Sequence, residues 1–184
     1  MFVIVDGMVN ITFVDNEDTI IGYGPRSEAI EKGLAHRIAR VFVFNSSGEL
    51  LIQKRSSNVK LAGKWDQSAA GHVDEGEEYA TAAAREAYEE IGLKDLNLTE
   101  IGKFYTEEVD ENILKKRFNM LYVAKYDGHL IHDNDEVSEI KWIGLNELKD
   151  WMDKNPYSGR PILYNITSIL RALLQDWLVM FVGC

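Results

Sequence analysis

The sequence predicts an α/β fold in which a mixed central β-sheet is sandwiched between helices. Short apolar runs bounded by turn residues predict several strands, an alanine-rich run predicts one helix, and apolar residues at helical spacing near the end predict another. The chain has 184 residues, and no segment rich in Pro, Gly or Ser divides it. We therefore expect one domain over residues 1–184, long enough to bury a full core.

The first residues predict a β-hairpin extension at the N-terminal side of the sheet. Residues 2–5, 8–14 and 20–23 are short apolar runs typical of strands. Asp6-Gly7 and the segment 16–18 supply the turns between them. A short helix is expected next, over residues 27–34.

Two paired strands are expected in the following segment. Residues 37–44 contain the apolar run VFVF, and the polar segment 45–48 is a strong turn signal. Residues 49–54 are expected to pair back as a second strand. A polar loop over residues 55–64 and a further extended segment, 65–70, lead to a glycine-containing loop.

The second half predicts one clear helix, three more strands and a helical tail. Residues 78–91 are strong helix formers, and Gly92 is well placed to end the helix. We expect strands at 98–105, 118–126 and 139–143, the first two followed by acidic loops, and a tail that starts at 145–154.

The apolar C-terminal segment is expected to be a packed helix. The positions that recur at helical spacing are Ile162, Ile166, Ile169, Leu170, Leu173, Leu174 and Trp177. Arg171, Gln175 and Asp176 interrupt residues 162–182, which argues against a membrane span. Residues 177–182 are either core or a dimer surface, so a homodimer is one possibility.

Composition limits the classes of function. Apolar content of 46% and charged content of 27% are typical of a soluble globular protein. The net charge of -10 argues against nucleic-acid binding, although a bound divalent metal would still allow a phosphorylated substrate. The only cysteine, Cys184, cannot form an internal disulfide, and no segment resembles a signal peptide. We expect a cytoplasmic protein.

Three glutamates of the predicted helix indicate a metal site. Glu86, Glu89 and Glu90 stand at i, i+3 and i+4, so they share one face, where like charges cost a few tenths of a kcal/mol per pair. A hard cation such as Mg²⁺ would remove this repulsion and bind substrate phosphates as well. A Glu-rich helix face that is only solvated is the alternative.

The spacing of residues around these glutamates favours the metal site over a helix face that is only solvated. The stretch GHVDEGEEYATAAAREAYEEIGL resembles the Nudix, or MutT-like, box G-x5-E-x7-R-E-U-x-E-E-x-G-U, in which U is apolar. Every fixed position matches, and Ala87 is a small occupant of one apolar position. At ordinary residue frequencies the fixed positions would align by chance with odds on the order of 10⁻⁶.

The resemblance implies a Nudix-type fold and a chemistry. It assigns Mg²⁺, with Mn²⁺ as a substitute, to Glu86, Glu89, Glu90 and the backbone carbonyl of Ala70, and support of the site to Gly71, Glu77, Arg85 and Gly92. The implied reaction is hydrolysis of the P–O–P bridge in a nucleoside diphosphate linked to a group X. Glu89 or Glu86 is the first candidate for the catalytic base, and the acidic-loop residues Glu107, Glu108, Glu111, Asp135 and Glu136 are alternatives.

The flanking residues resemble the Nudix branch that includes isopentenyl diphosphate isomerase. Where that isomerase has a catalytic cysteine, this chain has Ala70, which cannot transfer a proton to carbon. Of the isomerase's metal-binding histidines, His36 and His72 are present, and Ile30 replaces another. These departures from the isomerase pattern therefore favour hydrolysis. An isomerase-like enzyme and a non-catalytic binding or sensor module remain the alternatives.

Outside the box, several residues are weaker candidates for substrate contact. Arg55 could bind a phosphate with its planar fork, although a surface cation explains it equally well. Trp65 could stack on a base, although a tryptophan that leads into a buried strand is more often part of the core. Gln53, His72 and the basic run 115–117 are further candidates. We expect a small phosphorylated substrate derived from a nucleotide, with no nucleic acid or membrane as partner.

Overall fold

The computed structural model describes residues 9–110, 113–130, 132 and 135–159. The strand predicted at residues 2–5, the apolar segment 162–182 and Cys184 lie outside these residues. Within them the elements follow in the order β1 (Ile11–Val14), β2 (Ile20–Gly24), α1 (Arg26–Lys32), β3 (Ala35–Phe44), β4 (Glu49–Arg55), β5 (Trp65–Asp66), β6 (Ala69–His72), α2 (Tyr79–Ile91), β7 (Thr99–Asp110), β8 (Ile113–Lys125), β9 (Val137–Gly144) and α3 (Leu145–Lys154).

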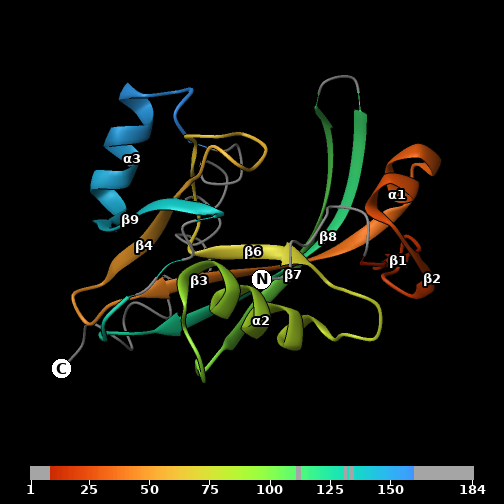
Figure 1. The fold of residues 1–184 in the computed structure, drawn as a ribbon, viewed down its shortest axis with the longest axis horizontal. Helices are drawn as coiled ribbons and strands as arrows, with labels where there is room; N and C mark the ends of the chain where they lie inside the picture. The colour runs from red at the N-terminus through yellow and green to blue at the C-terminus, as the bar shows by residue number, and fades with distance from the viewer. Residues whose placement is uncertain (1–8, 111–112, 131, 133–134, 160–184) are drawn as a thin grey trace.

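Strand β3 is the centre of one mixed sheet (Figure 1). It pairs with β8 in parallel and with β1, β4 and β6 in antiparallel orientation. Every residue of β3 is buried, as expected for a strand that is covered on both faces. The prediction of a mixed central sheet is confirmed, and β3 lies within two residues of the predicted strand.

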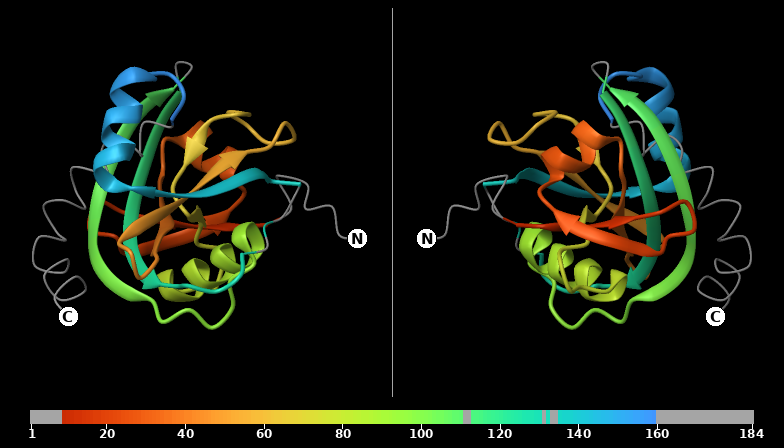
Figure 2. Two further views of the ribbon diagram at one scale, coloured as in Figure 1. Left: turned by 90° about the vertical axis from the view of Figure 1, so that its left-hand side faces the viewer. Right: turned by 90° about the vertical axis from the view of Figure 1, so that its right-hand side faces the viewer.

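Helices α2 and α3 cover opposite faces of this sheet (Figure 2). The alanines of α2 pack with alternate β3 residues such as Val41 and Val43 in one core. Leu148 and Met152 of α3 pack with Phe42 and Phe44, whose side chains point to the other face of β3, in a second core. The predicted sandwich architecture is confirmed.

The predicted N-terminal hairpin is present as β1 and β2, which pair antiparallel. It joins the main sheet where Phe13 lies opposite His36 of β3. Asp18, in the connection between the two strands, has a φ of 65°. Its carboxylate is buried and accepts hydrogen bonds from Arg37, Lys103 and Tyr79, so this turn is tied to three other parts of the fold.

Helix α2 begins and ends close to the predicted limits. Three of its six buried residues are alanines, which let the helix approach the sheet closely. Gly92 follows it in the left-handed conformation, with a φ of 70°, and backbone N–H groups of this cap bond the carbonyls of Ala87 and Tyr88. Among the described residues, no helix has the length and apolar character needed to span a membrane.

The long hairpin of β7 and β8 corrects one prediction. Glu107 and Glu108 do not lie in an acidic loop, because β7 continues through them. They stand opposite Lys116 and Lys115 of β8, and the Glu108 carboxylate accepts a hydrogen bond from Arg117 at 3.1 Å. Cross-strand pairing of opposite charges explains how so charged a segment remains in a sheet.

Candidate active site

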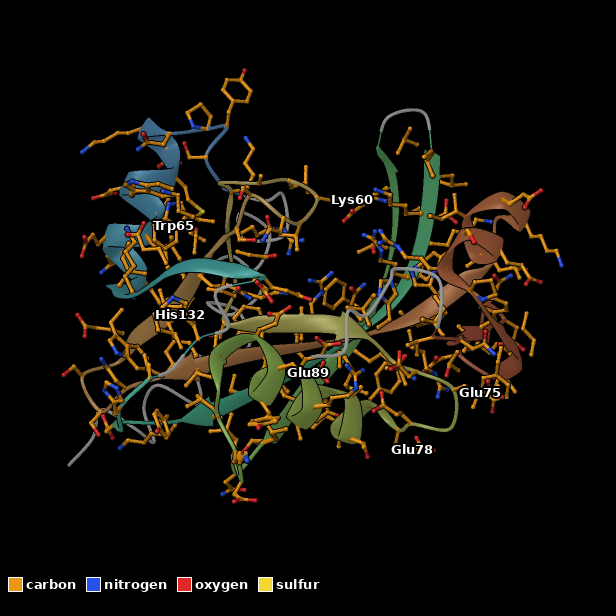
Figure 3. The ribbon with its side chains drawn as sticks, viewed as in Figure 1. Lys60, Trp65, Glu75, Glu78, Glu89 and His132 are labelled. Carbon is orange, nitrogen blue, oxygen red and sulfur yellow. The ribbon has the colours of Figure 1, made fainter. Side chains whose placement is uncertain are left out.

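The three box glutamates differ sharply in exposure although they share the end of α2. The Glu89 side chain is 44% exposed, and that of Glu86 is 13% exposed. Glu90 is buried at 6% exposure. Figure 3 shows Glu89 on the part of α2 nearest β6, with Glu78 at the distant start of the helix. The helix therefore presents two shielded carboxylates and one that solvent reaches.

Arg85 connects the helix to the loop that precedes it. Its Nη1 donates to Glu86 at 2.7 Å and to Glu89 at 3.1 Å. Its Nε and Nη2 donate to the two carboxylate oxygens of Glu77, each at 2.9 Å, and Nη2 also donates to the carbonyl of His72 at 2.9 Å. Such a fork-to-carboxylate pair is rigid, so Arg85 holds the glycine loop against the helix.

Strand β6 brings backbone groups to the same carboxylates. A Cβ on Gly71 would lie 1.8 Å from Oε1 of Glu86, so glycine is needed for this approach. The amide of Ala70 donates to Glu90 at 3.3 Å. Because the N–H and C=O of one strand residue project from the same edge, the Ala70 carbonyl faces the side on which Glu90 lies.

Gln53 of β4 holds the buried carboxylate of Glu90. Its Nε2 donates to Oε2 of Glu90 and to the carbonyl of Ser68. Gln53 is itself 2% exposed. It is thus a partner of a box glutamate, which the sequence could not show because the two are far apart in the chain.

Burial and mutual repulsion change the acidity of two box glutamates. Burial raises the pKa of Glu86 to about 7, where the charge of Arg85 opposes the rise and that of Glu89 adds to it. Burial also raises the pKa of Glu90 well above its usual range, and the charges of Glu86 and Asp66 add to the effect. A divalent cation would favour the ionised form of both groups.

The donor set fits a hard divalent metal. Among the described residues, no three His, Cys, Asp or Glu side chains are gathered as a ready metal site. The guanidinium of Arg85 is instead the cation that Glu86 and Glu89 share. The carboxylate oxygens of Glu86, Glu89 and Glu90 and the carbonyl oxygen of Ala70 match the preference of Mg²⁺ and Mn²⁺ for oxygen ligands.

Two of the weaker candidates are engaged elsewhere. Arg55 donates to the carbonyl of Lys60 at 2.7 Å and lies 4.0 Å from Asp66. Trp65 is 7% exposed and packs edge-on against Trp151, beside α3 in Figure 3. Arg55 thus braces its own loop, and Trp65 lies in the core that packs against α3.

The candidates for a base outside the box are scattered. Glu107 accepts a hydrogen bond from Tyr105, and Glu108 accepts one from Arg117, both on the hairpin. Glu111 lies outside the described residues. Asp135 and Glu136 precede β9, and the charge of Glu136 raises the pKa values of both Glu86 and Glu90. Glu136 is therefore the loop carboxylate that the structure brings near the box.

His36 and His72 lie together, with ring centroids 5.2 Å apart. Burial lowers the pKa of His36 to about 4, and the charge of Arg117 adds to this. Burial also lowers the pKa of His72 well below its usual range. Both rings are therefore neutral near pH 7. Arg117 belongs to the basic run 115–117 that the sequence indicated, whereas Arg26 and Arg40, which also act on His72, are marked by no local motif.

This chain matches one known domain family and several known proteins. Residues 34–164 match the NUDIX domain. An uncharacterized Nudix hydrolase of Pseudomonas aeruginosa is 38% identical over 134 residues, covering 72% of this chain and 77% of that protein. An isopentenyl-diphosphate Delta-isomerase of Photorhabdus laumondii is 32% identical over 148 residues, covering 79% of this chain and 83% of that enzyme.

Solved structures share the fold at lower identity. A crystal structure from Deinococcus radiodurans has a TM-score of 0.72 and 22% identity, covering 86% of this chain and 97% of that one. The NUDIX domain of Shewanella oneidensis NrtR, crystallised with ADP ribose, has a TM-score of 0.52 and 17% identity, covering 68% of this chain and 86% of that one.

Proposed function

We propose, from the premise that this chain belongs to the Nudix hydrolase family, that it is a divalent-metal-dependent pyrophosphohydrolase. Its substrate would be a nucleoside diphosphate linked to a group X, cleaved at the diphosphate bridge. The observation that carries the proposal is the arrangement of Glu86, Glu89 and Arg85, in which two box carboxylates already share one cation. Gly71 keeps β6 close enough for its backbone to complete the oxygen donors.

The metal would be held by Glu86, Glu89, Glu90 and the carbonyl of Ala70. When bound, it would neutralise the phosphate oxygens and lower the pKa of the attacking water. Gln53 orients Glu90 by donating to its carboxylate oxygen Oε2. Arg85 holds the glycine loop through Glu77, so the backbone of β6 keeps its place beside the carboxylates.

Glu89 is our choice of general base. It is the most exposed of the three box glutamates, so its carboxylate can accept a proton from a water that enters from solvent. The water oxygen bonds to one phosphorus, the bond from that phosphorus to the bridging oxygen breaks, and the other phosphate leaves. Glu136 is the alternative base because it acts electrostatically on Glu86 and Glu90.

A nucleotide-derived substrate is supported by the ADP ribose bound to the NUDIX domain of NrtR, which shares the fold. The test is a screen of the full chain with Mg²⁺ or Mn²⁺, in which the two phosphorylated products of each cleavage are separated by chromatography. It should cover nucleoside di- and triphosphates, nucleotide sugars, dinucleoside polyphosphates, coenzyme A and prenyl diphosphates. We expect metal-dependent cleavage of at least one nucleotide. Cleavage of none of them would contradict the proposal.

Isomerisation of a prenyl diphosphate is the second candidate, favoured by the 32% identity to an isomerase. Two observations weigh against it. The Ala70 side chain has no acidic or basic group, so it cannot transfer a proton to carbon. Arg117 stands opposite His36 in the register of β3 and β8, and its positive charge opposes binding of a metal cation by the histidines. We expect no conversion of isopentenyl diphosphate. Isomerisation without hydrolysis of any nucleotide would favour this candidate instead.

A further inference from the structure

Three side chains around β3 and β6 have buried polar atoms without a hydrogen-bond partner in the described part of the chain. They are Nε2 of His72, Nε2 of Gln67 and the ring nitrogens of His36, whose ring otherwise only approaches the backbone of Leu34. His36 is 2% exposed, and Gln67 is fully buried. Buried polar atoms are nearly always paired, so a group of such atoms in one place indicates a ligand.

The sheet register brings these side chains together. His36 and Arg40 share a face of β3, because residues at even spacing point the same way. Ile38 lies between His36 and Arg40 on β3, and His72 of β6 is its register partner. The ring centroids of His72 and His36 are 5.2 Å apart. Arg40 Nη1 donates to the side-chain oxygen of Gln67 at 3.2 Å, which places Gln67 at the same cluster.

Arg40 also fixes what Gln67 can offer to a ligand. The amide oxygen of Gln67 is the acceptor for Arg40, so its NH₂ group is left as a donor. Arg40 is held in turn by Asn119, whose side-chain oxygen accepts from Nε at 2.9 Å. Both Arg40 and Asn119 are buried, so the donor is set in a rigid place.

Guanidinium groups determine the sign of the charge that this cluster favours. Arg26, Arg40 and Arg117 all act electrostatically on the ring of His72. Arg117 is also the register partner of His36 on β8. Several positive charges at low dielectric repel a metal cation and attract an anion.

We propose that His36, His72 and Gln67, with Arg40 and Arg117 beside them, form a subsite for a phosphoryl group of the substrate. The box glutamates lie on the other face of β6, because the Cα of Gly71 faces Glu86 and its neighbour His72 faces the opposite way. Among the described strands β6 pairs only with β3, so a substrate with several phosphates can reach both groups past the other edge of β6. The proposal rests on the proposed function only in assigning the phosphoryl group to the substrate.

The direct test uses pyrophosphate as the probe and the full chain with EDTA, so that no metal contributes. The ring ¹⁵N resonances of the four histidines are followed during the titration. We expect those of His36 and His72 to shift and saturate while those of His129 and His132 stay. Unmoved resonances, or equal shifts at all four, would overturn the proposal.

Gln67→Glu tests the sign of the charge without changing the shape. The new carboxylate can still accept from Arg40, so we expect the fold to persist and pyrophosphate to bind about tenfold more weakly or worse, because like charges repel at low dielectric. Asn97→Asp adds the same charge at an exposed position and should leave the affinity unchanged. Equal affinity for Gln67→Glu and the parent would contradict the subsite.

A further variant separates this proposal from the proposed function. Glu89→Gln should lose metal-dependent turnover and keep the parent affinity for pyrophosphate in EDTA. If pyrophosphate binds at the histidines but the parent chain hydrolyses no substrate, the subsite is supported and the proposed hydrolase activity is contradicted. If the parent chain hydrolyses a substrate but the histidine resonances do not respond to pyrophosphate, the activity is supported and the subsite is contradicted.

Discussion

Gly71 and Glu86 approach each other so closely that a Cβ on residue 71 would stand 1.8 Å from the carboxylate oxygen Oε1. The first glycine of the box therefore leaves the space that the Glu86 carboxylate occupies. Its absent side chain lets a carboxylate from α2 lie against β6, and so links the two halves of the motif.

Gly71→Ala should reduce catalysis far more than stability. Glu86 is a flexible side chain and can move away from the new methyl group, so we expect unfolding to change by about 1 kcal/mol or less. The displaced carboxylate should lower kcat by about a hundredfold, as misplaced catalytic groups do. Metal-dependent kinetics and urea unfolding measure the two effects.

The matched control is Gly22→Ala in β2, where nothing lies within 4 Å of the new Cβ. It should keep the parent kcat. A Gly71→Ala variant with full activity would show that Glu86 does not need its place against β6.

Arg85→Lys should destabilise the metal-free chain. A lysine cannot reproduce the two-point contact with Glu77 or reach Glu86, Glu89 and the His72 carbonyl at once. We expect a loss of about 2 kcal/mol in unfolding free energy, measured by urea in EDTA.

Lys149→Gln serves as the comparison for Arg85→Lys, since it removes an exposed helix pair with Asp153 and should cost about 0.5 kcal/mol or less. Equal losses for both variants would mean that the Arg85 contacts contribute no more than a surface pair.

The stability of the metal-free chain should depend on pH through Glu86. Its pKa is raised to about 7 from an ordinary value of 4.5, so the folded state binds this proton more tightly than the unfolded state does. The stabilisation of the folded state by the tighter binding of this proton is therefore complete below about pH 4.5 and is lost as the pH rises through about 7.

The measurement for this pH effect is urea unfolding of the parent and Glu86→Gln in EDTA between about pH 5 and pH 8. The stability of the parent relative to the variant should fall as the pH rises. Mg²⁺ should reverse the trend, because it binds the ionised carboxylate. A constant difference between the two proteins would contradict the raised pKa.

Asp18→Asn should destabilise the fold by about 3 kcal/mol, as breaking a buried charge pair does. The Asp18 side chain is 4% exposed and accepts from Arg37 at 2.8 Å and Lys103 at 2.6 Å. Thermal or urea unfolding measures the loss. Asp153→Asn, at an exposed pair, should cost little. A similar small effect at Asp18 would show that this network does not anchor the hairpin.

Local signals explain which elements could be predicted from the sequence. The alanine run and Gly92 determine α2 through propensity and capping, which act within a few residues. The extent of β7 could not be predicted, because Glu107 and Glu108 are poor strand formers that depend on cross-strand lysines.

The site residues likewise divide into those that local spacing predicts and those that depend on contacts between distant segments. Spacing alone indicates Glu86, Glu89 and Glu90, because the motif lies within one loop and one helix. The contact of Gln53 with Glu90 joins residues 37 positions apart, and that of Arg40 with Gln67 joins residues 27 apart. Such pairs become visible only when the sheet register is known.

The most direct test of the central claim is the Mg²⁺-dependent turnover of Glu89→Gln and Glu90→Gln on the best nucleotide from the substrate screen. Each variant should lose about a hundredfold or more in kcat with an unchanged fold by circular dichroism, because each loses a metal-binding carboxylate. Glu78→Gln, at the exposed start of α2, should match the parent. Parent-like turnover in both Glu89→Gln and Glu90→Gln would show that the box glutamates do not carry the reaction.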